Sequence, residues 1–515
     1  MPRRRVVGEG NGARGGEQTG MKKALVLTLD LGTSSVRAML FDARGRAVPG
    51  AEAQTAYAQT TGADGGVETD PEMLLTLTVG AVRKLVKAAD APTLARIAGV
   101  GVSCFWHSLV GVGADGRAVT PLLSWADARA QVQATRLQKT LDESEYHKRT
   151  GCVLHPSYWP AKLCWLYETR PQEAAKAAQW MSFGEYLTLR LFGEAKCSLS
   201  MASGTGLLDP NTKRWDDKTL AALPVTRDHL VTPDDQAEPQ SGVVKEWARG
   251  LGPLQSLPWF PAFVDGACSN VGSGATGDDR IAINVGTSGA MRVAVRAAHV
   301  DIAPGLFCYR VDGERLLVGG AFANGGNVHA WAGRTLLLGT ARAETRTVAA
   351  LPPDGHGLTV LPLWAGERSP GWHVGARATV TGMNLHTTPQ DILRASLEAV
   401  AYQFAAVRDT LGASHPSATQ IVASGGALVH DTAWTQIMAD VFGVPVTTSR
   451  VFEASSRGAA LLALSALGLI GDLADVPAFL GKTYTPHPAS HAVYEKARAR
   501  HEALYALMLG GNGAK

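Results

Sequence analysis

A pattern of strand, Gly-Thr-Ser turn and strand occurs once in each half of the 515-residue chain, and it constrains the fold more than any other feature. The first copy is ALVLTLDLGTSSVRAMLFD at residues 24–42, and the second is RIAINVGTSGAMRVAV at residues 280–295. Aliphatic runs on both sides of a turn are typical of buried strands. A single Gly-Thr-Ser tripeptide is a common turn, but two copies in matching contexts indicate a duplicated architecture with one hairpin in each half.

The length of the chain predicts two large domains, because one hydrophobic core rarely organises so many residues. We expect a disordered basic tail at residues 1–20, an N-terminal domain at residues 21–272 and a C-terminal domain at residues 273–515. The tail carries four Arg and two Glu, so it supplies two of the three net positive charges. The rest of the chain is nearly neutral, and nucleic acid is therefore not an expected partner.

The cysteines and the apolar runs bear on the cellular compartment. Six cysteines stand at positions 104, 152, 164, 197, 268 and 308, and no CxxC pair occurs. Scattered thiols favour neither a zinc site nor a thioredoxin motif, and they fit a reducing cytoplasm. The longest apolar run, at residues 459–471, is too short to span a bilayer, and the tail lacks the apolar stretch of a secretory signal. We therefore expect a cytoplasmic protein without a membrane partner.

Glycine-rich turns are the candidate phosphate and nucleotide sites. In both Gly-Thr-Ser turns, glycine lets backbone N–H groups approach phosphate oxygens, and the hydroxyl groups add donors. A third candidate is Gly425-Gly426 in IVASGGALVHDTAW, where a strand runs into a helix with apolar periodicity. Glycines at such a turn either border a flat base and its ribose or serve the turn alone, and the sequence leaves both interpretations open.

Two aspartates are candidates for the carboxylates that phosphoryl transfer needs. Asp30 ends the first predicted strand beside the first turn, where a carboxylate suits Mg²⁺ but can also cap a turn. Asp265 follows the apolar segment PWFPAFV and precedes small residues, so no bulky neighbour keeps it from a cleft. Because Asp-Gly is also a common turn pair, the residues alone leave a structural interpretation of Asp265 open.

Eight segments together resemble the FGGY family of carbohydrate kinases over nearly the whole chain from Lys22 to Gly468. They are LDLGTSSVRAMLFD, GGVETDPE, WHSLVGVGADGRAVTPLLSWADAR, FVDGACSNVGSG, INVGTSGAMR, GGAFANGG, LPLWAGERSPGWHVGARATVTGM and VASGGAL, in the order and spacing of the family. The resemblance implies an α/β fold of two actin-like (ribonuclease-H-like) domains, each with a mixed five-stranded sheet flanked by helices, and an ATP cleft between them. It also implies ATP-dependent phosphorylation of a sugar or sugar acid.

Within the family, several segments look more like gluconokinases than like glycerol or xylulose kinases. They are HSLVGVGADGRAVTPLLSWADAR, YHKRTGCVLHP, FGEYLTLRLFGE, SGTGLLD, and FCYRVDG followed by GGAFANGGNVHAW. The leading expectation is therefore the conversion of D-gluconate to 6-phosphogluconate. Two departures leave the substrate open: the segments Cys104-Phe105-Trp106 and SYWPAKL at residues 157–163 are bulkier than is usual there, and both are expected to border the sugar pocket.

Alternatives remain inside and outside this class. A xylulokinase, or a kinase of another polyol or sugar acid, is the alternative within the family. An actin-like ATPase or a sugar-binding regulator without kinase activity is the more distant one, although the chain keeps Asp265 and has no helix-turn-helix segment before Ala24.

The resemblance also implies roles for individual residues. Asp265 matches the catalytic base, and Asp30 is expected to meet Mg²⁺. The phosphates of ATP would be held by Gly32, Thr33, Ser34, Gly286, Thr287 and Ser288, and the adenine and ribose would be bordered by Gly326, Gly425, Gly426 and Ala427. The sugar would contact His107, Trp125 and Asp127 beside Asp265, with the sugar mainly on the N-terminal domain and ATP mainly on the C-terminal domain.

A carboxylate substrate would require a cation in the pocket. Lys162, Arg129 and His155 are the candidates, and the sequence does not choose among them. Besides ATP and Mg²⁺, the expected binding partner is a small-molecule sugar or sugar acid. A homodimer is compatible with the sequence, which does not fix the oligomeric state.

Overall fold

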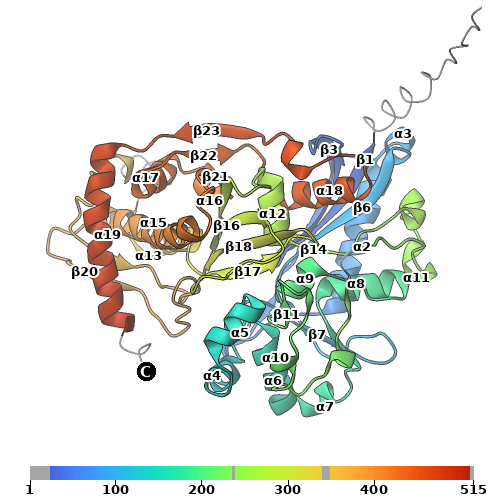
Figure 1. Cartoon of the computed structure of the whole chain (residues 1–515). Helices are drawn as coiled ribbons and strands as arrows, with labels where there is room; N and C mark the ends of the chain where they lie inside the picture. Colours follow the sequence, from blue (N-terminus) through green and yellow to red (C-terminus); the bar gives the residue numbers. More distant parts are fainter. Residues whose placement is uncertain (1–23, 235–237, 339–347, 511–515) are drawn as a thin grey trace, which may run out of the picture.

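Two β-sheets organise the chain in the computed structural model, which describes residues 24–234, 238–338 and 348–510 (Figure 1). The tail expected at residues 1–20 lies outside the described residues. The first sheet has the strand order β14-β6-β1-β2-β3, and the second has the order β17-β18-β16-β15-β21-β22-β23. Helices flank both sheets, and this confirms the expected α/β architecture of two actin-like domains.

The first sheet is mixed and has the expected five strands. β1 pairs antiparallel with β2 and parallel with β6, and β6 pairs parallel with β14. The aliphatic run of β1 is buried on both faces, as its sequence predicts. The strands are β1 (Leu25–Leu31), β2 (Ser35–Asp42), β3 (Ala47–Ala56), β6 (Ile97–Cys104) and β14 (Phe263–Val264).

The second sheet has seven strands, so the expectation of five is wrong for this half. The additional strands β17 and β23 extend its two edges. Apolar periodicity could not reveal them, because β17 has only four residues and four of the five residues of β23 are exposed. The strands are β15 (Arg280–Val285), β16 (Gly289–Arg296), β17 (Phe307–Arg310), β18 (Arg315–Phe322), β21 (Gln420–Ser424), β22 (Val446–Ser449) and β23 (Leu480–Tyr484).

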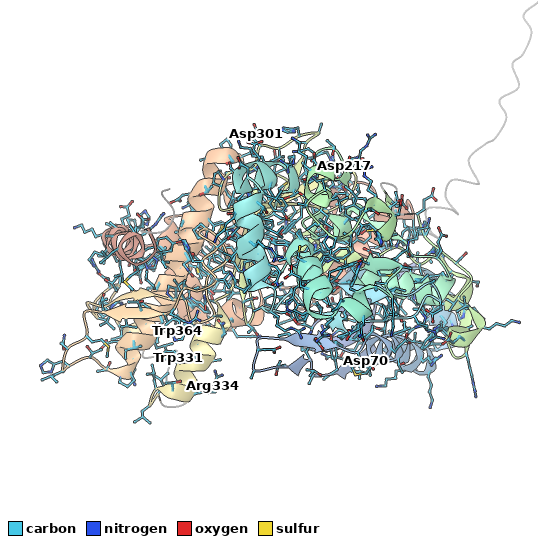
Figure 2. The ribbon with its side chains drawn as sticks, turned by 90° about the horizontal axis from the view of Figure 1, so that it is seen from below. Asp70, Asp217, Asp301, Trp331, Arg334 and Trp364 are labelled. Carbon is cyan, nitrogen blue, oxygen red and sulfur yellow. The ribbon has the colours of Figure 1, made fainter. Side chains whose placement is uncertain are left out.

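The first helix of the N-terminal half begins where its sequence predicts. The side chain of Asp70 accepts hydrogen bonds from the backbone N–H groups of Glu72 and Met73, and Pro71 occupies the first helical position. The resulting helix α2 (Pro71–Ala88) packs against β2 and β3. Figure 2 shows Asp70 at the right-hand side of the molecule, far from the packed pair Trp331 and Trp364 on the C-terminal half.

Two glycines allow the helices α12 (Asp265–Ser273) and α18 (Ala454–Ala466) to cross in close contact. A Cβ atom on Gly272 would lie 1.8 Å from the carbonyl oxygen of Ala454, and one on Gly458 would lie 1.8 Å from that of Cys268. α18 also packs against β1 and β6. A helix from the C-terminal half of the chain therefore completes the core of the first sheet.

Other helices cover the sheets and form a helical region in the first half. The longer ones are α4 (Gln131–Thr140), α5 (Glu143–Thr150), α6 (Trp159–Thr169), α8 (Phe183–Phe192), α13 (Gly326–Thr335), α15 (Pro389–Ser414), α17 (Thr432–Phe442) and α19 (Pro488–Leu509), and the shorter α9 (Leu199–Ser203) and α16 (Gly426–Val429) join them. Short elements are β4 (Thr60–Thr61), β5 (Val67–Thr69), α3 (Ala91–Leu94), β7 (Val110–Val112), β8 (Leu122–Leu123), α7 (Pro171–Ala174), β9 (Gln179–Met181), β10 (Cys197–Ser198), β11 (Leu208–Asp209), β12 (Arg214–Trp215), α10 (Asp217–Leu220), β13 (Pro233–Asp234), α11 (Lys245–Ala248), β19 (Thr359–Leu361) and β20 (Thr379–Thr381). No helix in the described ranges is both long and apolar enough to cross a membrane.

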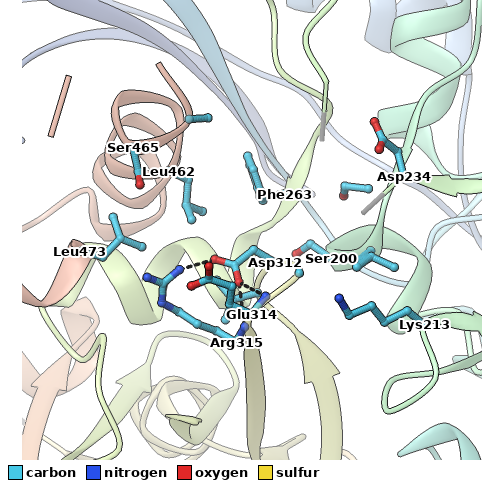
Figure 3. A pocket seen from close by; sticks show the side chains of 15 residues that line it. Ser200, Lys213, Asp234, Phe263, Asp312, Glu314, Arg315, Leu462, Ser465 and Leu473 are labelled. Atoms are coloured by element: carbon cyan, nitrogen blue, oxygen red, sulfur yellow. Dashed lines mark hydrogen bonds and ion pairs between the residues drawn. The ribbon is translucent and has the colours of Figure 1, made fainter. Parts of the chain in front are cut away.

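The edge strand β17 joins the two halves of the molecule. The backbone N–H of Cys308 donates to the carbonyl oxygen of Gly151 at 2.9 Å, and the N–H of Arg310 donates to Oγ of Ser203 at 2.9 Å. Beyond this contact lies a polar cavity of about 480 Å³ (Figure 3). Ser200 and Phe263 line it from the first half, and Asp312 and Arg315 line it from the second.

Candidate active site

Asp30, His107 and Asp265 lie where three parallel strands of the first sheet end. β1 runs parallel to β6, and β6 runs parallel to β14, so their carboxyl ends meet at one edge of the sheet. Asp30 stands at the end of β1, His107 follows β6, and Asp265 follows β14. Ligand sites of α/β proteins commonly lie at this edge.

Asp265 is the first residue of α12, and its carboxylate accepts a hydrogen bond from the N–H of Gly266 at 2.7 Å. Its side chain is not fully enclosed. Burial raises the pKa of the carboxyl to about 6, and the charge of Asp30 adds to this, whereas Arg292 opposes it. A carboxyl group with this pKa is mostly ionised at neutral pH and can still accept a proton, which suits a general base.

Asp30 has a surrounding that fits a magnesium ligand. Oγ of Ser103 donates to its carboxylate at 2.9 Å, and Oγ of Ser456 donates at 3.4 Å. Burial raises its pKa, while the neighbouring Arg37 lowers it, but Arg37 makes its ion pair with Glu453 instead. Among the described residues no Lys or Arg pairs directly with Asp30, so this hard oxygen donor can bind Mg²⁺.

The first Gly-Thr-Ser turn joins β1 to β2 immediately after Asp30. The N–H of Gly32 donates to the carbonyl oxygen of Ser35 at 3.0 Å, and the hydroxyl of Tyr57 donates to the carbonyl oxygen of Gly32 at 2.7 Å. Thr33 and Ser34 reach the surface of the turn. Their hydroxyl groups therefore lie beside the carboxylate that fits a metal ion.

Three further glycine turns meet at one edge of the second sheet. β15, β18 and β21 run in the same direction, and they lead into Gly286, Gly326 and Gly425 respectively. The N–H of Gly326 donates to the carbonyl oxygen of Gly286 at 2.8 Å. The structure thus brings together the predicted nucleotide residues Gly286, Thr287, Ser288, Gly326, Gly425, Gly426 and Ala427.

The glycines of these three turns, which together we call the glycine cradle, differ in what surrounds them. A Cβ atom on Gly425 would lie 2.3 Å from the carbonyl oxygen of Val285, and Gly425 has a φ of +87°. A Cβ atom on Gly326 would lie 2.5 Å from the carbonyl oxygen of Gly286. Nothing lies within 4 Å of the same position on Gly286. Close backbone packing therefore explains Gly425 and Gly326, and it does not explain Gly286.

His107 is held as a neutral hydrogen-bond acceptor. Its backbone has a φ of +62°, unusual for a residue with a side chain, and its ring Nδ1 donates to the carbonyl oxygen of Gly204. Burial lowers its pKa well below the ordinary value, and the nearby charge of Arg368 lowers it further. Nε2 therefore carries a lone pair that can accept a hydrogen bond from a sugar hydroxyl.

Trp125 and Asp127 lie after β8 but differ in accessibility. Trp125 is half-buried and faces the guanidinium of Arg368 at 5.8 Å. The carboxylate of Asp127 is only 1% exposed, and it accepts hydrogen bonds from the N–H of Val67 and from Arg129. The structure thus does not present Asp127 as an open hydrogen-bonding group.

The three predicted cation candidates do not supply a free positive charge. Lys162 is fully buried and donates to the carbonyl oxygens of His107 at 2.7 Å and Ser124 at 2.8 Å, and burial lowers its pKa to about 7. Arg129 forms ion pairs with Asp127 and Glu68. Burial lowers the pKa of His155 to about 3, so it is neutral. In this structure Lys162 and Arg129 already have partners and His155 is neutral, so the expectation that one of them meets a substrate carboxylate stays a prediction.

Arg368 is the cation that sequence reasoning missed. Its guanidinium lies 5.8 Å from the ring of Trp125 and 5.4 Å from that of Trp372. Its Nε is buried without a hydrogen-bond partner, and it forms no ion pair within the described ranges. The signal was present in LPLWAGERSPGWH, but an arginine in a loop is usually solvated, and only the fold brings this loop to His107.

Aromatic side chains from both halves surround His107. Its ring centroid lies 4.8 Å from that of Tyr158 and 5.7 Å from that of Trp106. Tyr309 of β17 contacts both, because its hydroxyl lies 2.5 Å from that of Tyr158 and its ring centroid lies 4.4 Å from that of Trp106. The two bulky segments noted in the sequence therefore lie beside His107.

Comparison with known proteins agrees with this geometry. The N-terminal domain of the FGGY family of carbohydrate kinases matches residues 25–272, and the C-terminal domain of that family matches residues 281–467. The chain is 28% identical over 485 residues to a gluconokinase of Bacillus subtilis, covering 91% of this chain and 93% of the relative. It is 29% identical over 516 residues to a glycerol kinase of Acidovorax sp., covering 94% and 99%.

Solved structures give the same result. A crystal structure of gluconate kinase from Lactobacillus acidophilus superposes with a TM-score of 0.88 at 28% identity and covers 95% of this chain and 99% of that one. A ligand-bound xylulose kinase from the same organism gives the same values. Both domain matches together span most of the sequence. The chain therefore belongs to the FGGY family of carbohydrate kinases.

Proposed function

We propose that this carbohydrate kinase transfers the γ-phosphoryl group of ATP to the C6 hydroxyl of D-gluconate and so forms 6-phosphogluconate and ADP. Arg368 is the observation that carries the choice of a sugar acid. The side chain is half-buried, its Nε is enclosed without a hydrogen-bond partner, and its guanidinium forms no ion pair in the described part of the chain, so an anionic group would complete the site. Glycerol and xylulose have no charge to offer, whereas the carboxylate of gluconate matches the guanidinium in a bidentate arrangement.

The residues around Arg368 support the binding of a polyhydroxylated chain. Trp125 offers an apolar face to C–H groups, and the lone pair on Nε2 of His107 accepts a hydrogen bond from a hydroxyl. Asp127 and Lys162 act indirectly, because Asp127 holds Arg129 and Lys162 holds the backbone at His107 and Ser124. Sites that bind hydroxyls in this way discriminate strongly against analogues that lack them.

Asp265 acts as the general base in this proposal. Its carboxylate takes the proton of the C6 hydroxyl as the oxygen of that hydroxyl forms its bond to phosphorus. Asp30 would hold Mg²⁺, which neutralises negative charge on the phosphates when bound. Gly32, Thr33 and Ser34 would contact the phosphates from the first half of the chain.

The division of labour between the halves follows from these roles. We assign the sugar mainly to residues 21–272 and the nucleotide mainly to residues 273–515, with the glycine cradle of the second sheet bordering the phosphates, ribose and adenine. Approach of the halves would exclude water, which otherwise competes as a phosphoryl acceptor.

An ADP-release assay over a panel of acceptors tests the proposal. D-Gluconate and D-glucitol form the decisive pair, because they differ only at C1, where one has a carboxylate and the other a hydroxymethyl group. We expect gluconate to have the highest kcat/KM, ahead of glucitol, xylulose and glycerol. A preference for xylulose or glycerol would refute the choice of a sugar acid, and ADP release without any acceptor would support an actin-like ATPase instead.

A further inference from the structure

Arg292 is a second arginine of the site, and the proposed function alone gives it no role. It lies on β16, after the second Gly-Thr-Ser turn. Residues two apart in a strand share a face, and Met291 and Val293 belong to the core of the second half. Ala294, on the same face as Arg292, instead packs into the hydrophobic cluster of the first half. The side chain of Arg292 therefore leaves the second sheet toward the first domain.

Two glycines provide the space that this guanidinium occupies. A Cβ atom on Gly266, the residue after Asp265, would lie 3.1 Å from Nη2 of Arg292 and 2.6 Å from the ring of Trp106. A Cβ atom on Gly319, opposite Arg292 in the β16–β18 register, would lie 3.1 Å from its Cγ atom. The guanidinium thus takes the position beside Asp265 that a side chain at residue 266 would otherwise fill.

The charge of Arg292 has no partner in the described structure. Its Nε is buried without a hydrogen bond, and no carboxylate of the described residues lies within ion-pair distance. Burial lowers its pKa to about 10, which leaves it positively charged at neutral pH, and Asp265 is the charge that most opposes this shift. Asp265 attracts this charge without forming a direct ion pair, and Nε of Arg292 has no acceptor, so the guanidinium keeps a donor for an anionic group that joins it during function.

We propose that Arg292 donates hydrogen bonds to the phosphoryl group as it passes to the hydroxyl held by Asp265. The proposal rests on the function proposed above. In the step, the bond from the γ-phosphorus to the β,γ-bridging oxygen breaks and ADP leaves with that electron pair. A bond forms between phosphorus and the substrate oxygen, and the proton of the hydroxyl goes to Asp265. Arg292 stabilises the charge on the equatorial oxygens of the phosphoryl group.

Arg292 and Arg368 serve opposite ends of the substrate in this arrangement. The reacting hydroxyl must lie at Asp265, and Arg292 lies beside Gly266 at that end. Arg368 lies between Trp125 and Trp372, where the carboxylate of an extended acid would sit. The two arginines should therefore affect different kinetic constants.

Steady-state kinetics of Arg292→Gln separates the two roles. We expect kcat and kcat/KM for gluconate to fall together, on the order of 10³-fold, since the interaction forms only in the transition state. Arg292→Lys, which keeps the charge, should recover part of the loss. A raised KM with kcat preserved would overturn the proposal, because Arg292 would then bind the substrate in its ground state.

Binding of ADP with aluminium fluoride, a mimic of the phosphoryl group in transfer, provides a readout independent of turnover. In the presence of gluconate, the wild-type protein should bind ADP more tightly when aluminium fluoride is added. Arg292→Gln should lose this gain and keep its affinity for ADP alone. A variant that retains the fluoride-dependent gain would also refute the proposal.

A second variant covers the case in which Arg292→Gln does not fold. Gly266→Ala keeps the guanidinium but forces it or Trp106 to move, so it should also lose kcat and the fluoride-dependent gain. Normal values for Gly266→Ala would contradict the proposed position of Arg292. If the acceptor panel shows another sugar to be the substrate, the proposed function fails, whereas the same measurements with that sugar still test Arg292.

Discussion

The two sides of the proposed active site, one for the nucleotide and one for the sugar, are built from different parts of the polypeptide. On the nucleotide side, backbone atoms of Gly286, Gly326 and Gly425 approach one another at the ends of three strands. On the sugar side, the side chains of His107, Arg368 and the surrounding aromatic residues come from distant loops. The nucleotide side therefore depends on the absence of side chains, and the sugar side depends on their charge and protonation.

This difference determines how each side responds to substitution. A backbone cradle tolerates changes that leave its glycines in place, and it recognises groups common to all its family, such as phosphates. A pocket made of side chains can change its substrate by changing one charge. The variants below test whether nucleotide binding and sugar selectivity are as separate as the two constructions suggest.

Asp265→Asn is expected to have the largest effect. The amide keeps the size of the side chain but cannot accept the hydroxyl proton, so kcat should fall on the order of 10³-fold. ADP affinity, measured by calorimetry, should not change, because the nucleotide cradle is on the other sheet. Asp301→Asn, at an exposed residue labelled in Figure 2, is the matched control. Near-normal turnover of Asp265→Asn would refute the assignment of Asp265 as the general base.

Arg368→Gln should change sugar selectivity and leave the nucleotide side intact. Loss of a charge-assisted hydrogen bond costs about 1.5–3 kcal/mol, which corresponds to a rise in KM for gluconate of about 10- to 150-fold. The kcat/KM for D-glucitol should stay unchanged, so the preference for the acid disappears. Arg334→Gln on α13, whose side chain is exposed, is the control. An equal loss for both acceptors would show that Arg368 is structural.

The sequence predicted the clustering of the glycine turns better than the charges around His107, for physical reasons. Gly-Thr-Ser turns between aliphatic strands are local patterns, and the parallel strands that follow bring Gly286, Gly326 and Gly425 to one edge. The charges of the sugar pocket depend on long-range burial. The sequence offers Lys162 as one candidate cation, but its ammonium group donates to two backbone carbonyl oxygens. Arg368 is recognised only when its loop is seen beside Trp125.

The fold shows the same limit. The duplicated pattern predicts one hairpin in each half, and the family resemblance implies five strands in each sheet. β17 and β23 are edge strands too short or too polar for periodicity to reveal. The packing of α18 against the first sheet is likewise absent from any local pattern, since it joins residues far apart in the chain.

The pH dependence of the reaction should report the sugar-side carboxylate. Burial raises the pKa of Asp265 to about 6, so the base is protonated and inactive below this pH and ionised above it. We expect kcat/KM for gluconate to rise about tenfold per pH unit up to about pH 6 and then to level off. ADP binding measured over the same range should not follow this curve. A profile that is flat well below pH 6 would contradict the assignment of Asp265.

Alanine substitutions at two glycines of the cradle distinguish a glycine needed for backbone packing from one needed for ligand contact. Their expected effects are smaller than those of the substitutions at Asp265 and Arg368. Gly425→Ala puts a Cβ atom 2.3 Å from the carbonyl oxygen of Val285 at a φ of +87°, so it should lower the free energy of unfolding by roughly 1–3 kcal/mol. Gly286→Ala meets no protein atom within 4 Å, so the free energy of unfolding should hardly change. If Gly286 borders the phosphates, its methyl group should nevertheless weaken ADP binding. Denaturant unfolding and calorimetry on both variants measure these two quantities. Unchanged ADP affinity in Gly286→Ala would mean that this turn is structural, and the nucleotide side would then need another phosphate contact.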